Sequence, residues 1–413
     1  MKFFLNLSVF ILGIGNMIPA QSQIRTVQCY PVGSPFAEPV IELGSGQQLF
    51  FSFDDLSSET NSYTYKIVHC DPDWNNSNLS SFTYLTGFFS NPLDNYEYSF
   101  NTVVPYTRFT LNLPNEEVGI KLSGNYLLQV YNDQNPDSAV VSQRFAVVEN
   151  KVGIAASVVN STNPTFLYTS RQLNFTVNYT GLQIYNPVRD TRVYVTQNQD
   201  PNSRRNFTPT FVRQNQLVYG NGSDNIFNGL SPFRNFQCSS LVYYTRYVKD
   251  VLKGPEGRYN FILVPGTVPQ RYIPTPDRGG GNFYIEAENV QNSDLEADYI
   301  VAHFAILYPE PIPGAEVYIY GKFADWQLLP ELKMDYDAKN KAYVGQAELK
   351  QGYYDYMFAV VPSKEKKPDL VTMQNNFYQT PDEYNIRFYM YDYNVMCFRL
   401  LGYQTVGAKP MGS

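Results

Sequence analysis

The sequence has few of the side chains on which most enzymes depend. Its 413 residues include 2 histidines and 4 cysteines, and charged residues make up 17% of the chain. The cysteines are far apart, and no Cys-x-x-Cys pair is present to form a metal knuckle or a redox dithiol. No Gly-x-Ser-x-Gly elbow, His-Glu-x-x-His motif or Walker motif occurs. These absences argue against hydrolases, zinc enzymes and nucleotide-binding enzymes.

The two histidines, His69 and His303, both lie inside alternating strand-like patterns. A single histidine in such a pattern is typical of a core or rim position, whereas acyl-transfer catalysis needs a nucleophile held by a base and an oxyanion hole. We therefore expect no catalytic residue, and no cofactor is implied.

Basic surface, long apolar runs and helical periodicity are also scarce. The formal net charge is -7, which argues against a nucleic-acid groove, because such a groove needs a concentrated basic face. Beyond the N-terminus no segment reaches the roughly 18 consecutive apolar residues of a membrane span. No stretch shows sustained 3.6-residue periodicity with helix caps, so the pattern predicts a chain that is nearly all β.

The N-terminus has the features of an export signal. Lys2 precedes an apolar segment, Phe3–Ile14, which is too short to span a bilayer, and Ala20-Gln21-Ser22 is a small-x-small cleavage site. Residues 1–22 are therefore predicted to be a signal peptide. The segment before Cys29 is a poor lipobox, so we expect an exported, soluble protein without a lipid anchor.

What the sequence has in abundance is aromatic side chains in alternating runs. There are 35 tyrosines and 28 phenylalanines, which favour pleated, half-buried surfaces. Residues 63–70 and 109–113 alternate with period two, as strands do. Gly124-Asn125-Tyr126 enters another strand in the manner of immunoglobulin-like sandwiches, where such a tyrosine often packs at a corner.

Turn signals divide these strands into three blocks of sandwich size. The predicted domains are 23–150, 151–293 and 294–405, followed by a tail at 406–413. Within the second block, residues 197–206 are polar and rich in structure breakers, which predicts a loop. The predicted fold is all-β: tandem immunoglobulin-like or E-set-like sandwiches, the last resembling a glycogen-binding-type sandwich.

Two groups of carboxylates are candidates for a calcium site or for a catalytic pair. Residues 71–75, Asp-Pro-Asp-Trp-Asn, alternate oxygen ligands as a calcium loop would, but Asn76 replaces the tight glycine, so an Asx-rich turn is favoured over calcium. The adjacent pairs Asp54-Asp55 and Glu116-Glu117 point to opposite faces of a strand and cannot flank one glycosidic bond, so they are interpreted as solvated. No metal site is predicted.

Cys29 and Cys70 lie in one block, and a disulfide or two buried free thiols are both compatible with the sequence, free thiols being favoured.

Trp326 gives the one small-molecule hypothesis. The segment Gly321-Lys322-Phe323-Ala324-Asp325-Trp326 resembles the glycogen- and starch-binding modules, in which an indole stacks on a sugar ring. Trp326 is thus the glycan-stacking candidate of an alternative function, a periplasmic or surface glycan-binding protein. A core position for Trp326 is favoured, because the second tryptophan, Trp74, belongs to another block.

An ordered set of motifs resembles the family of type IX secretion system plug proteins, formerly a domain of unknown function. The motifs are His69-Cys70-Asp71-Pro72-Asp73-Trp74, Leu113-Pro114-Asn115-Glu116, Ser123-Gly124-Asn125-Tyr126, Phe233-Arg234-Asn235-Phe236, Leu349-Lys350-Gln351-Gly352-Tyr353-Tyr354 and Asn376-Phe377-Tyr378-Gln379-Thr380.

The resemblance implies a non-enzymatic periplasmic protein at the inner face of the outer membrane. Its expected partner is the giant outer-membrane β-barrel translocon. The protein would seal the periplasmic end of the translocon pore sterically. Residues 197–219 and 271–283, polar segments with interspersed tyrosines, are the expected contacts, because tyrosine and arginine are favoured at interfaces.

Overall fold

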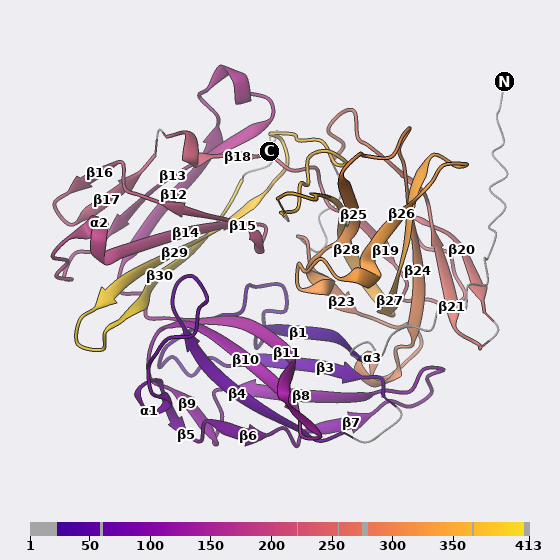
Figure 1. Ribbon diagram of the computed structural model, residues 1–413, viewed down its shortest axis with the longest axis horizontal. Helices are drawn as coiled ribbons and strands as arrows, with labels where there is room; N and C mark the ends of the chain where they lie inside the picture. The colour runs from indigo at the N-terminus through magenta and orange to yellow at the C-terminus, as the bar shows by residue number, and fades with distance from the viewer. Residues whose placement is uncertain are drawn as a thin grey trace.

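The structure, a computed structural model, describes residues 23–57, 61–220, 222–254, 256–274, 280–365 and 367–408. The predicted signal peptide at 1–22 lies outside these ranges, as do residues 275–279 of one expected contact segment and most of the predicted tail. The described chain is almost entirely β-strand, with helices of no more than four residues, so the predicted all-β class is confirmed. Three sandwiches form a triangle (Figure 1).

The first sandwich packs two sheets over an aromatic core. One sheet has the order β1 (Ile24–Pro31), β3 (Leu49–Asp55), β8 (Thr107–Leu113), β7 (Tyr96–Tyr98). The other has the order β2 (Val40–Glu42), β11 (Asn135–Val148), β10 (Gly124–Asn132), β4 (Tyr63–Cys70), β6 (Ser90–Pro92), and β5 (Leu85–Gly87) pairs separately with β9 (Val118–Ile120). The period-two pattern predicted for residues 63–70 is the burial pattern of β4, whose odd-numbered side chains face the core.

The second sandwich is completed by strands from the C-terminal end of the chain. One sheet contains β12 (Gly153–Asn160), β13 (Ser170–Asn178), β17 (Gln216–Tyr219) and β16 (Phe211–Arg213), with β18 (Ile226–Asn228) also on β13. The other has the order β15 (Asp200–Phe207), β14 (Thr191–Gln197), β29 (Glu383–Asp392), β30 (Cys397–Gly407). In Figure 1 the yellow C-terminal strands lie beside the magenta ones.

The third sandwich is a ten-stranded sheet that bends around a single core. Its main order is β19 (Arg234–Gln237), β28 (Gly352–Pro362), β25 (Ala315–Tyr320), β26 (Lys333–Asp337), β27 (Ala342–Lys350), β24 (Tyr299–Leu307), β21 (Tyr259–Leu263), β20 (Val248–Lys253). The short strands β22 (Gly266–Thr267) and β23 (Phe283–Ile285) pair with β24 and β28. A single apolar cluster fills the space between its strands.

These sheets do not follow the boundaries predicted after the first block. Strands β19 to β23 precede residue 294 but pair inside the third sandwich, and β29 and β30 follow it but pair with β14. Strand alternation shows which face of a strand is buried but not which distant strand it joins. The three blocks of strands therefore assemble differently from their order along the chain.

The predicted loop at residues 197–206 is wrong. Residues Asp200–Phe207 form strand β15, and the turn before it is made by Asn198 and Gln199 alone, with φ of 53° and 59°. Two consecutive residues with positive φ are the signature of a tight hairpin turn, in which asparagine is favoured. The polar composition reflects a strand at the edge of its sheet rather than a loop.

A corner tyrosine recurs in two sandwiches. Tyr126 is fully buried, and its hydroxyl donates a 2.7 Å hydrogen bond to the carbonyl of Leu122, four residues upstream. Tyr354 repeats the arrangement with the carbonyl of Lys350 at 2.6 Å. The corner position predicted for Tyr126 is thus present, and the Gly-x-Tyr sequence at 352–354 marks a second one.

Candidate functional site

Neither histidine lies in a catalytic arrangement. His69 is 1% exposed, its Nδ1 lies 2.9 Å from Ser77 Oγ, and its ring packs edge-on to Tyr126. A Cβ atom on Gly124 would come within 2.5 Å of the His69 ring, which explains the glycine at that position. His303 lies in the third sandwich, where its Nε2 is 2.9 Å from Asn260 Oδ1. Each ring has a structural role in its own sheet.

Burial of His69 predicts a pH effect on stability. Burial lowers its pKa from 6.5 to about 4, so the unfolded chain takes up a proton first as the pH falls. Stability present above about pH 6.5 is therefore lost on acidification towards pH 4. Between pH 7 and 4.5 the wild type should lose about 2 kcal/mol more unfolding free energy than His69→Gln, measured by urea unfolding. Parallel pH profiles for the two proteins would contradict this prediction.

The carboxylate-rich turn at 71–75 is occupied by its own backbone. Asp71 Oδ1 accepts hydrogen bonds from the amides of Asp73 and Asn75 at 2.8 and 2.9 Å. Asp73 is directed away to the second sandwich, where it pairs with Arg204 and accepts a 2.9 Å hydrogen bond from Tyr194. The favoured Asx turn is what the structure shows. Over the described ranges no group of three histidine, cysteine or acidic side chains is arranged to hold a metal ion.

The interpretation of Asp54 and Asp55 as solvated is wrong. Both are buried, and they point to opposite faces of β3, as adjacent strand residues must. Asp55 accepts a 2.9 Å hydrogen bond from Tyr63. Asp54 faces the third sandwich, and a sequence pattern gives no sign that a second sandwich covers that face. Glu116 and Glu117, in contrast, are exposed as expected.

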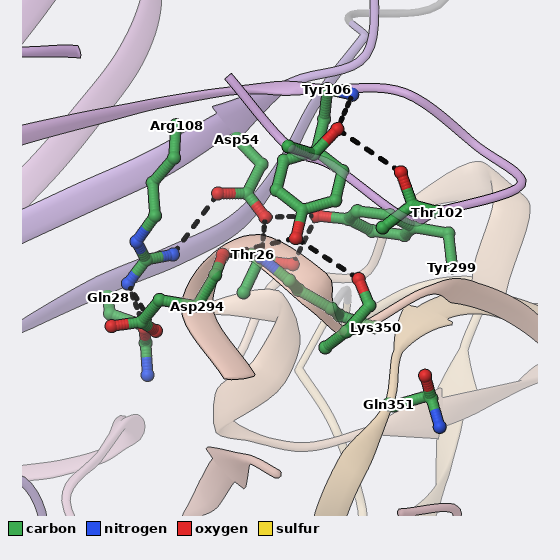
Figure 2. A network of polar contacts seen from close by, with 12 residues as sticks. Thr26, Gln28, Asp54, Thr102, Tyr106, Arg108, Asp294, Tyr299, Lys350 and Gln351 are labelled. Carbon is green, nitrogen blue, oxygen red and sulfur yellow. Dashed lines mark hydrogen bonds and ion pairs between the residues drawn. The ribbon is translucent and has the colours of Figure 1, made fainter. Parts of the chain in front are cut away.

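Asp54 is the centre of a buried charge network between the first and third sandwiches (Figure 2). Lys350 Nζ lies 2.6 Å from Asp54 Oδ2, and both side chains are 0% exposed. Arg108 contacts the other carboxylate oxygen at 3.1 Å, and the Tyr299 hydroxyl donates to Asp54 at 2.8 Å. Burial lowers the pKa of Lys350 to about 8, against the opposing effect of Asp54.

Polar contacts also fix the second sandwich to the other two. Toward the first sandwich, Arg387 forms a 2.6 Å ion pair with Glu38, and both side chains are nearly buried. An apolar cluster that includes Val40, Tyr389 and Leu400 lies beside this pair.

Two hydrogen bonds join the second sandwich to the third. The Tyr320 hydroxyl donates to Asp200 at 2.8 Å, and the Asn202 amide donates to the carbonyl of Trp326 at 3.0 Å. Every pair of sandwiches is therefore joined by buried or nearly buried polar groups.

A cavity of about 720 Å³ opens where the three sandwiches meet. Both tryptophans of the chain line it, although they come from different sandwiches. Trp326 is only 4% exposed, and its ring packs against Tyr320 with centroids 5.3 Å apart. So buried an indole has little face to offer a sugar ring, which argues against the glycan-stacking alternative. The favoured core position of Trp326 agrees with its burial.

All four cysteines are buried free thiols. Burial raises the pKa of Cys29 to about 12 and that of Cys70 to about 11, so neither is a reactive thiolate. Of the two alternatives that the sequence left open, the structure has the free thiols.

In the part of the chain that is described, no helix is long and apolar enough to cross a bilayer.

Comparison with known proteins gives a family and a solved relative. Residues 24–149, which make up the first sandwich, match the model of the type 9 secretion system plug protein first domain. The crystal structure of a hypothetical protein from Parabacteroides merdae is similar over 94% of this chain and 98% of its own, with 31% identity and a TM-score of 0.89. No curated protein matches. The chain belongs to the family of type IX secretion system plug proteins.

Proposed function

We propose that this chain is a non-enzymatic periplasmic plug that docks on the giant outer-membrane β-barrel translocon of the type IX secretion system and seals the periplasmic end of its pore. Membership of the family places it with the type IX secretion apparatus. The periplasmic location follows from the predicted signal peptide. The sealing role is inferred from the architecture.

The observation that supports sealing is that buried or nearly buried polar contacts hold all three sandwiches to one another. A steric plug works by bulk, so it must not separate into narrower parts under thermal motion. Interfaces between domains of one chain are by default mobile unless they are large and well packed. Here each junction holds buried or nearly buried polar groups, including the Lys350–Asp54 pair and the Arg387–Glu38 pair. Separating the sandwiches would expose these groups without their partners.

The docking surface is proposed to include the two polar segments singled out in the sequence. Residues 197–219 contain the edge strand β16, on which Phe211 and Val212 are exposed. An exposed edge strand with apolar side chains is a ready surface for pairing with another chain. In the second segment, 271–283, Ile273 is also an exposed apolar side chain.

Deletion of the gene tests the proposal directly. A closed β-barrel satisfies its own backbone hydrogen bonds, so the translocon should remain folded without its plug. Large dyes or antibiotics that the outer membrane excludes should then enter the cells, and re-expression of the wild-type chain should restore exclusion. A second deletion, of the barrel, should also abolish the leak. Normal exclusion in the plug deletion at normal barrel abundance, or a purified barrel that never retains this chain, would refute the proposal.

A further inference from the structure

The central cavity has the size and position of a ligand site. Its volume of about 720 Å³ lies within the range of roughly 300–1,000 Å³ that is usual for small-molecule sites. Residues from all three sandwiches, which form the triangle in Figure 1, contribute to its wall. Pockets at junctions between domains are a preferred location for ligands.

The backbone at this cavity is strained at both tryptophans. Trp74 has φ of 69° and Trp326 has φ of 58°, and Asp325 beside it has φ of 49°. Bulky residues adopt positive φ rarely, at a cost of about 1–3 kcal/mol each, and such residues cluster at binding and catalytic sites. That both tryptophans of the chain are strained and line the same cavity is an observation that core packing alone does not explain.

The cavity is positively charged. Four cations and three carboxylates line it, and two of the cations are paired: Arg387 with Glu38, and Arg204 with Asp73. The remaining cations are Arg144 and Lys322, and neither forms an ion pair with any described residue.

The two unpaired cations differ in what holds them. Lys322 Nζ is held by the amide oxygens of Gln199 and Asn282 at 2.8 and 2.5 Å. Burial lowers the pKa of Lys322 to about 8, so most of its positive charge is kept at neutral pH. The third carboxylate, Asp325, offsets part of the charge of both cations: burial raises its pKa, and Arg144 and, less strongly, Lys322 lower it.

Arg144 lies over the ring of Trp74. Its guanidinium carbon lies 4.9 Å from the centroid of the indole ring, a cation–π arrangement. This contact uses none of the guanidinium N–H groups, and among the described residues no side chain or carbonyl accepts a hydrogen bond from them. A planar fork of this kind fits a group with two coplanar oxygens, so a carboxylate can accept two parallel hydrogen bonds from it.

We propose that the central cavity binds the carboxylate end of a peptide chain, with Arg144 as the fork that holds the carboxylate. The side-chain amide oxygens of Gln143, Asn202 and Gln327 along the wall supply acceptors for peptide N–H groups, whereas the amide N–H groups of Asn202 are already bonded to Tyr320 and Trp326. Leu328, which is only partly buried, provides apolar surface for the preceding side chain. Lys322 adds a positive charge that favours an anion over a neutral ligand. The proposal does not depend on pore sealing.

The test uses the tryptophans as reporters, because the chain has no others and both line the cavity. The purified mature chain is titrated with a pool of N-acetylated tetrapeptides that end in a free carboxylate, and then with the same pool amidated at the C-terminus. We expect a saturable fluorescence change, confirmed by calorimetry, with the amidated pool at least about tenfold weaker. Arg144→Gln should weaken binding of the free acids by at least about tenfold, and Arg144→Lys by less.

Arg246→Gln is the matched control, since Arg246 is exposed, lies over the ring of Tyr247 at 4.8 Å and does not line the cavity. It should bind as the wild type does. Three results would overturn the proposal: no saturable binding of the free-acid pool, equal affinity for the amidated pool, or unchanged affinity in Arg144→Gln. Inorganic phosphate is titrated in parallel, and if it binds as tightly as the peptides, the cavity is a simple anion site instead. If Arg144→Gln fails to fold, the comparison of acid with amide and the Arg144→Lys variant still decide.

Discussion

Asp54→Asn should destabilise the protein by about 3–5 kcal/mol, the usual cost of removing one member of a buried ion pair. Lys350 Nζ would then keep the carbonyl of Asp294, at 2.7 Å, and the faces of the Tyr106 and Tyr299 rings, whose centroids are 3.9 and 5.9 Å away. An ammonium group that is 0% exposed and lacks a carboxylate must either stay charged at a large cost or lose its proton.

Removal of the lysine should cost less than removal of the aspartate. In Lys350→Met, Asp54 keeps Arg108 and the Tyr299 hydroxyl, so its charge remains compensated. We expect a loss of about 1–3 kcal/mol, the range for a charged hydrogen-bond partner. The double variant Asp54→Asn, Lys350→Met should be more stable than Asp54→Asn alone, because no unpaired ammonium is left buried.

Urea unfolding followed by tryptophan fluorescence measures these differences, and it also reports on the junction, since both indoles lie there. Asp335→Asn, at an exposed position of β26, is the control and should change stability by less than about 0.5 kcal/mol. If Lys350→Met proves more harmful than Asp54→Asn, or if the costs of the two single variants simply add, the network does not have the charge balance described here.

Local patterns predicted the strands well, because in a half-buried strand every second residue faces the core and is apolar. Strand β4 occupies the predicted range Tyr63–Cys70, and Gly124-Asn125-Tyr126 marks the corner that it was expected to mark. Burial on one face of a sheet selects apolar side chains with period two whatever the partner strand is. The all-β class could therefore be predicted from sequence.

Contacts between sandwiches could not be predicted in this way. Asp54 looked solvated because a charged residue in a strand usually faces water, and its partner Lys350 is 296 residues away along the chain. Strands β14 and β29, which pair with Thr191 opposite Met390, are also far apart in sequence. The central cavity joins Trp74 to Trp326, which the sequence assigned to separate blocks. Each of these features depends on how finished sandwiches dock, and no periodicity records that step.

Trp326→Ala should be nearly as destabilising as the loss of Asp54, with an expected cost of about 3–5 kcal/mol. The indole packs with Tyr320 and Ala359 and with partly buried Phe233 and Leu370, so its removal leaves a cavity among side chains held by two strands. Trp74→Ala should cost about 1 kcal/mol, since Trp74 is only partly buried and loses chiefly its stacking with Arg144.

The variant Trp326→Ala also distinguishes a structural role of Trp326 from a role in stacking on a sugar ring. An indole that stacks on a sugar ring must be exposed, so its replacement by alanine would abolish glucan binding with little change in stability. A buried indole gives the opposite result: a large loss in urea unfolding, and no saturable fluorescence response of the wild type to soluble glucans. Glucan binding that is lost in Trp326→Ala at unchanged stability would therefore reinstate the glycan-binding alternative. The 4% exposure of Trp326 leads us to expect the structural outcome.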